Sequence, residues 1–177
     1  MSSLKPADLL DELSSMRRYA RSLTRDQNEA DDVVQDALLK ALEKRHTFRP
    51  DGSRRGWLLA IVHNIFISSR RREGAATRRD AQFAEAAISS LEPNQENAAY
   101  LRDVARAFNA LPEAQREVIH LISVEGQSYH EAAAILGIPV GTVMSRLGRA
   151  RITLRRLQGE EPNGRRELTI VGGRDAD

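Results

Sequence analysis

The chain contains no cysteine, and aromatic side chains make up only 5% of its 177 residues. The first absence excludes disulfides, thiolate catalysis and thiolate zinc sites, and it is compatible with a reducing compartment. The scarcity of aromatic residues favours a helical core of Leu, Ile, Val and Ala over a β-sandwich. The remaining composition, 41% hydrophobic and 29% charged, is typical of a globular protein.

Long apolar runs are also missing. The longest, Trp57 to Val62, is far too short to cross a membrane. The first residues, Met1 to Leu13, include acidic side chains and have no continuous apolar stretch, unlike a signal peptide. We therefore expect a soluble, cytoplasmic protein that does not insert into a membrane.

Proline is scarce inside the periodic segments, and no strand-like alternation occurs, so the sequence predicts an all-α fold. We expect one helical unit over 5–72 and a second over 98–157. The segment 73–97 has weak periodicity and contains Gly74 and Pro93, which indicates a flexible linker with a short helix around Arg79 to Ile88. The segment 158–177 is rich in glycine and charge and is expected to be a disordered tail.

The first unit is expected to contain three helices. These are Leu9 to Leu23, then Glu29 to Arg45 after a break, then a helix capped by Ser53 that continues to about Arg72. The second helix has a predicted core face of Val33, Val34, Ala37, Leu38, Ala41 and Leu42. The third is expected to bury Trp57, Leu58, Ile61, Val62 and Ile65, and to project Ala60, His63, Asn64, Ile67 and Arg71.

Charge is distributed in blocks. The stretch from Asp26 to Glu43 is strongly acidic, whereas the stretch from Arg54 to Arg79 is strongly basic. The stretch from Val140 to Leu157 holds five arginines and no acid. This pattern indicates a polyanion contacted in two places and a different partner contacted by the acidic face.

The second unit contains a predicted helix-turn-helix. Ser128 and Glu131 have the spacing of a capping box, which marks the start of a short helix. Gly137 is expected to end that helix, and Pro139 to start the next. At about 100° per residue, one arc of the second helix is apolar and another is polar. The apolar arc is Val143, Leu147, Ala150, Leu154 and Leu157, and the polar arc is Thr142, Ser145, Arg146 and Arg149.

Two segments together resemble a known family. The segment Asp31 to Leu42, followed by Phe48-Arg49 and by Arg55-Gly-Trp57-Leu-Leu-Ala-Ile-Val-His-Asn64, resembles region 2 of bacterial sigma factors. Leu111 to Arg151 resembles region 4, in particular Gly126 to Glu131 and Pro139-Val-Gly-Thr-Val-Met-Ser-Arg-Leu-Gly-Arg-Ala-Arg151. Both regions occur in order with a short linker, as in the extracytoplasmic-function group.

The resemblance implies three binding surfaces for a transcription initiation factor. RNA polymerase core, through its β′ coiled coil, would contact Asp32, Gln35, Asp36 and Leu39. The −10 DNA element would contact His63, Asn64, Arg70, Arg71 and Arg72. The −35 element would contact Thr142, Ser145, Arg146, Arg149 and Arg151. The resemblance further implies contact with the polymerase β flap, control by an anti-sigma factor, and no cofactor.

Four positions deserve separate interpretation. Met144 and Gly148 depart from the family pattern on the recognition helix, so the −35 sequence stays open. Gly56 is a weak helix residue and is expected to loosen its turn. Trp57 lies on the apolar face, so core packing is favoured over stacking on a DNA base.

Three alternative functions are an enzyme, a stand-alone DNA-binding regulator and a sigma-like adaptor. An enzyme is disfavoured because the histidines are scattered without metal-ligand spacing and no phosphate-binding glycine loop occurs. A stand-alone DNA-binding regulator would need no second DNA surface, which the arginines around Asn64 provide. A sigma-like adaptor that binds only proteins remains open.

Overall fold

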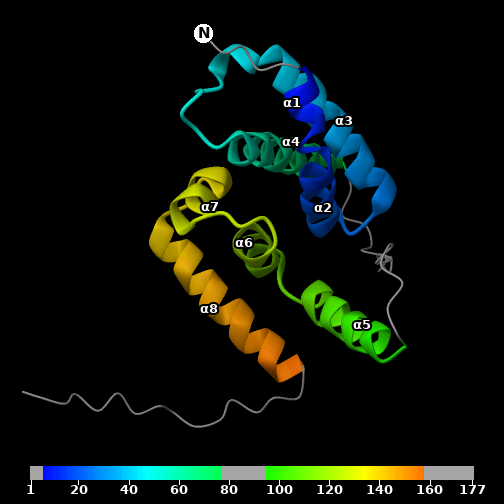
Figure 1. Cartoon of the computed structure of the whole chain (residues 1–177). Helices are drawn as coiled ribbons and strands as arrows, with labels where there is room; N and C mark the ends of the chain where they lie inside the picture. The colour runs from blue at the N-terminus through cyan, green and yellow to red at the C-terminus, as the bar shows by residue number, and fades with distance from the viewer. Residues whose placement is uncertain (1–5, 77–94, 158–177) are drawn as a thin grey trace, which may run out of the picture.

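A computed structural model describes residues 6–76 and 95–157 (Figure 1). Every regular element in these ranges is helical. The first group is α1 (Pro6–Leu10), α2 (Leu13–Thr24), α3 (Gln27–Glu43), a 3₁₀ turn η1 (Arg45–Thr47) and α4 (Arg54–Ala76). The second group is α5 (Gln95–Asn109), α6 (Glu113–Ser123), α7 (Tyr129–Leu136) and α8 (Val140–Leu157). The predicted short helix near Arg79 and the predicted tail lie outside the described residues.

The first group is a bundle in which α2, α3 and α4 pack on one another. Its core is aliphatic, as the composition predicted, with Tyr19 and Phe66 as its fully buried aromatic side chains. Local signals set the helix boundaries. Arg25 adopts a left-handed conformation with φ 61° after α2, and the Asp26 carboxylate accepts the Glu29 N–H at 2.8 Å to cap α3. Ser53 Oγ accepts the Gly56 N–H at 3.0 Å, which confirms the predicted cap.

The second group contains the predicted helix-turn-helix. Ser128 and Glu131 form a capping box at the start of α7, in which each side chain accepts the other residue's backbone N–H. Gly137 follows α7 with φ 64°, in the left-handed region that glycine tolerates best. Both predictions are thus confirmed, and α8 buries Val143, Leu147 and Ala150.

The two groups are packed together. Helix α6 lies against α2 and also contacts α7 and α8, while α7 lies against α4 (Figure 1). As a result all six residues from Arg116 to Leu121 are buried, on every side of α6. None of the helices in the described ranges is long and apolar enough to cross a membrane.

Several local predictions were wrong. The expected first helix is split, because α1 ends at Leu10 and α2 begins at Leu13. Between them Glu12 accepts a hydrogen bond from Arg55 of α4 at 2.8 Å. Leu42, expected in the core, is 39% exposed although the adjacent Ala41 is fully buried, so the buried face of α3 is narrower in its last turn than the periodicity predicted.

Helix α4 also differs from its predicted pattern. It continues to Ala76 and buries Leu59 and Phe66, which the single apolar face omitted. The physical reason is that α2 and α3 pack on α4 from one group and α7 packs on it from the other. Trp57 is half-buried rather than fully buried, and its ring centroid lies 5.5 Å from that of Phe48.

Candidate functional site

The α3 helix presents a mixed acidic and apolar stripe. Asp32, Gln35, Asp36 and Leu39 are all exposed, at the i, i+3, i+4 and i+7 spacing of one helical face. Leu39 is 62% exposed and contributes the apolar part of this stripe. The opposite face, with Val33, Val34 and Ala37, is in the core. The four residues predicted to bind polymerase therefore lie together on an accessible surface.

The outer surface of α4 carries Asn64 and a run of arginines. Asn64, Arg70, Arg71 and Arg72 are exposed. The Arg70 guanidinium lies 5.8 Å from the centroid of the Phe66 ring and 3.6 Å from Glu113 of α6. Arg72 Nε donates to the Ser68 carbonyl oxygen at 3.3 Å. An exposed amide followed by cations on one helix can hydrogen-bond a base and attract the adjacent phosphates.

His63 does not join this surface. The prediction that it projects beside Asn64 is wrong in this arrangement, because its side chain is only 8% exposed. The Tyr19 hydroxyl lies 3.3 Å from His63 Nδ1, and burial lowers the His63 pKa to about 4. The imidazole is therefore neutral near pH 7 and belongs to the interior.

The exposed face of α8 is not centred where the polar arc predicted. Ser145, Arg149 and Arg151 are exposed, whereas Thr142 and Arg146 are half-buried. Met144, which the polar arc omitted, is 55% exposed. A Cβ built on Gly148 would meet no heavy atom within 4 Å, so this part of α8 borders open space. The accessible surface thus combines arginines with two large apolar side chains, Met144 and Ile152.

Arg146 is electrostatically linked to a buried acid. Glu117 of α6 is 6% exposed, and its pKa is raised to about 7 by burial first and by Glu113 second. The positive charges of Arg146 and Arg116 oppose that rise. Arg146 is therefore close enough to favour the charged form of a buried acid, and it is itself half-buried.

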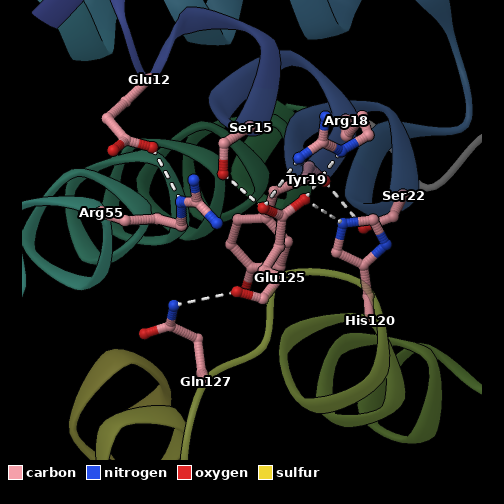
Figure 2. A network of polar contacts seen from close by, with 9 residues as sticks. All are labelled: Glu12, Ser15, Arg18, Tyr19, Ser22, Arg55, His120, Glu125 and Gln127. Carbon is pink, nitrogen blue, oxygen red and sulfur yellow. Dashed lines mark hydrogen bonds and ion pairs between the residues drawn. The ribbon is translucent and has the colours of Figure 1, made fainter.

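A second buried acid joins the two helical groups (Figure 2). Glu125, in the α6–α7 loop, is 2% exposed. Its carboxylate accepts hydrogen bonds from Ser15 Oγ and, at 3.1 and 3.2 Å, from two nitrogens of Arg18, both on α2. His120 Nε2 of α6 lies 3.2 Å away. We call Ser15, Arg18, His120 and Glu125 the Glu125 clasp.

The electrostatics of the clasp are strongly favourable to the ionised acid. Burial alone would raise the Glu125 pKa, but the hydrogen bonds from His120, Arg18 and Ser15 outweigh it and lower the pKa to about 2. Glu125 is therefore ionised at neutral pH. Tyr19, which stacks on His120 with ring centroids 5.6 Å apart, has its own pKa raised by burial.

Arg116 forms another connection between the groups. It is 1% exposed, its Nε donates to the Ser22 carbonyl oxygen of α2 at 2.6 Å, and its Nη1 donates to the Leu111 carbonyl oxygen at 3.0 Å. Arg25 donates to the same Leu111 oxygen at 3.3 Å. Burial lowers the Arg116 pKa to about 10, so its guanidinium is still charged at neutral pH.

The burial of Arg116 and Glu125 has no counterpart in the local sequence pattern. Their partners on α2 lie 94 to 110 positions away in the chain, so no local periodicity indicates the contact. Gly56 was interpreted as a weak helix residue, but a Cβ there would lie 3.1 Å from Gln127 Oε1 of the second group. Its lack of a side chain permits a close approach of the two groups.

Comparisons with known proteins match both halves of the chain. Residues 9–63 match the family model described as the Sigma2 domain of PhyR. Residues 101–154 match the model described as Sigma-70, region 4. The two models cover the first helical bundle and the helix-turn-helix, respectively.

Individual relatives agree. The chain is 37% identical over 172 residues to the ECF RNA polymerase sigma factor EcfG of Rhodopseudomonas palustris, covering 94% of each protein. It is 37% identical over 132 residues to the ECF RNA polymerase sigma-E factor of Escherichia coli, covering 68% of this chain and 69% of that one.

A solved structure of the sigma factor RpoE from Bartonella quintana, in complex with the anti-sigma factor NepR, is similar with a TM-score of 0.70 and 35% identity. The match covers 86% of this chain and 95% of that one. CnrH in complex with the cytosolic domain of CnrY gives a TM-score of 0.60 at 31% identity, covering 86% of both chains. This chain therefore belongs to the extracytoplasmic-function RNA polymerase sigma factors, which direct promoter-specific initiation of transcription and are not enzymes.

Proposed function

We propose that the α3 stripe binds the β′ coiled coil of RNA polymerase core while α4 and α8 read the −10 and −35 elements. The observation that carries this proposal is the separation of the three surfaces. The acidic stripe, the Asn64 surface and the pair Arg149 and Arg151 occupy different helices and are exposed. A contact of region 4 with the β flap would be the second contact of the chain with polymerase core. The proposed units are 5–72 and 98–157, joined by 73–97.

For the −10 element, Asn64 would bind a base and Arg70, Arg71 and Arg72 the phosphates. We leave His63 out of this surface because it is buried and neutral. An asparagine amide both donates and accepts, so it can recognise one edge of an unstacked base. The arginines would make the affinity fall as the salt concentration rises.

For the −35 element, Arg149 and Ser145 are the residues best placed to contact base edges, with Arg151 on a phosphate. Arg146 and Thr142 are half-buried and would mainly position α8, Arg146 through Glu117. Arg149→Ala should then cost about 1–3 kcal/mol at one base pair, whereas Arg151→Ala should weaken binding to all sequences alike. Equal losses across all sequences for Arg149→Ala would contradict this assignment.

We also propose that an anti-sigma factor controls this chain. Support comes from the two similar structures, in which the sigma factors RpoE and CnrH are bound by NepR and CnrY. Co-purification from cells should recover a partner that blocks transcription by the reconstituted holoenzyme. Preparations free of any inhibitor under every growth condition would contradict this proposal.

A second candidate function is that of a sigma-like adaptor that binds only proteins. The match of residues 9–63 to the Sigma2 domain of PhyR is the observation in its favour. The experiment that separates the two functions is run-off transcription with core polymerase on a pool of genomic promoter fragments. A sigma factor yields defined transcripts that core alone does not, whereas an adaptor yields none and fails to bind core.

A further inference from the structure

The contact between the two helical groups buries charge, which is unusual for surfaces that merely touch. Glu125 and Arg116 are 2% and 1% exposed, and the partners of each include groups on α2 in the other half of the chain. An ion of this kind is costly to bury unless it is paired with good geometry. Here Glu125 has three side-chain partners from two helices, and Figure 2 shows them converging on its carboxylate.

The packed arrangement is too small to hold both promoter elements at once. Helix α7 lies between α4 and α8, and two successive helix packings separate their axes by about 20 Å. With 18 residues, α8 is about 27 Å long. The −10 and −35 elements lie about 25 base pairs apart, or about 85 Å along B-DNA. Binding to both elements therefore requires the two groups to separate.

The chain has the reach for such a separation. The segment 77–94 joins the groups, and at about 3.5 Å per residue it can span up to about 60 Å when extended. Added to the lengths of the helices on either side, this covers the promoter distance. Separation would expose Glu125 and Arg116 to water, which would solvate each charge in place of its partners on α2.

We propose that the packed arrangement is an autoinhibited closed state, and that the Glu125 clasp is the latch that holds region 4 on region 2. The clasp contributes only in the closed state, so it sets the fraction of molecules that are open and able to span a promoter. The apparent affinity of the protein for core polymerase and promoter DNA equals the affinity of the open state multiplied by the fraction of open molecules. This inference goes beyond the proposed residue roles and depends on them only for its transcriptional readout.

The test follows the distance between the groups in the full chain. Because the protein has no cysteine, Asp51→Cys and His130→Cys introduce two unique dye positions, both exposed, one in the loop before α4 and one at the start of α7. The adjacent residues Gly52 and Glu131 line the same pocket, so the two dyes lie close together in the closed state. Single-molecule energy transfer should show a high-transfer population in the free protein. Core polymerase with promoter DNA should convert it to low transfer.

Arg18→Met removes two hydrogen bonds from the clasp while keeping the aliphatic stem. The closed-to-open ratio should fall about 10- to 100-fold, the range for hydrogen bonds to a charged group. The matched control is Arg17→Met, one position earlier on α2, where the arginine pairs with Asp31 of its own group at 3.7 Å. The control should behave like the parent protein. At limiting sigma concentration, Arg18→Met should also give more run-off transcript than the control.

Two results would overturn the latch. One is a free parent protein that is already in low transfer, and the other is an Arg18→Met distribution identical to that of Arg17→Met. If Arg18→Met loses helical circular dichroism, Ser15→Ala takes its place and must shift the same population towards low transfer. The transfer measurement needs no transcription, so failure of the latch and failure of the proposed sigma function are distinguishable.

Discussion

Buried Glu117 makes a quantitative prediction about stability and pH. Its pKa is about 7 in the folded protein against 4.5 for an unperturbed glutamate, chiefly because of burial. The folded pKa is the higher one, so the stabilising contribution is complete below pH 4.5 and is lost as the pH rises through 7. Each pH unit between the two values costs about 1.4 kcal/mol, so by pH 8 the loss is about 3 kcal/mol.

Glu117→Gln keeps the size of the side chain and removes its titration. The difference in unfolding free energy between the variant and the parent should therefore grow by about 3 kcal/mol in favour of the variant from pH 4 to pH 8. Urea denaturation followed by circular dichroism at each pH measures this difference. Taking the difference cancels the contributions of His63 and Glu125, which are present in both proteins. The exposed Glu43→Gln serves as a control of opposite sign: the hydrogen bond from Lys40 lowers the Glu43 pKa, so this variant should not gain stability over the parent as the pH rises. A flat difference for Glu117→Gln would refute the reasoning.

Three further substitutions address the surfaces and the local structure. Asp36→Arg should abolish binding to core polymerase in a pull-down, while Gln27→Arg, which is exposed on α3 but lies off the face of the stripe, should bind normally; equal binding by both would exclude the α3 stripe. Asn64→Ala should relax base preference in the −10 element without changing core affinity, as measured by run-off transcription on single-base promoter variants. Unaltered preference would remove Asn64 from the −10 surface. Ser128→Ala should lower the free energy of unfolding by about 1 kcal/mol because the α7 capping box loses an acceptor, and an unchanged urea midpoint would contradict that role.

The predictability of the fold depended on how far apart in the chain the interacting residues are. The capping box of Ser128 and Glu131 and the helix stop at Gly137 rest on contacts within a few residues, so the sequence alone predicted them. The exposed acidic stripe of α3 follows likewise from helical periodicity. The packing of α6 against α2 has no such local signal.

The errors have the same origin. His63 was placed on a projecting face because an isolated helix has one buried side, whereas α4 is packed by helices of both groups. The sequence does not predict burial of Arg116 and Glu125, because charged side chains are rarely fully buried unless paired. Their partners become neighbours only after the two halves of the chain pack together. For Arg146 the sequence predicts a contact with DNA alone, since its attraction to Glu117 depends on the placement of α6.

The measurement that tests the central claim most directly is site-specific photocrosslinking in the reconstituted holoenzyme on promoter DNA. A photoreactive amino acid at position 64 tests the −10 surface, and one at position 149 tests the −35 surface. The proposed roles predict crosslinks to the non-template strand at the −10 element from the first and to the −35 duplex from the second, about 25 base pairs apart. Crosslinks from both positions to the same element, or none to DNA in a complex that contains core polymerase, would contradict the claim that the two halves read separate promoter elements.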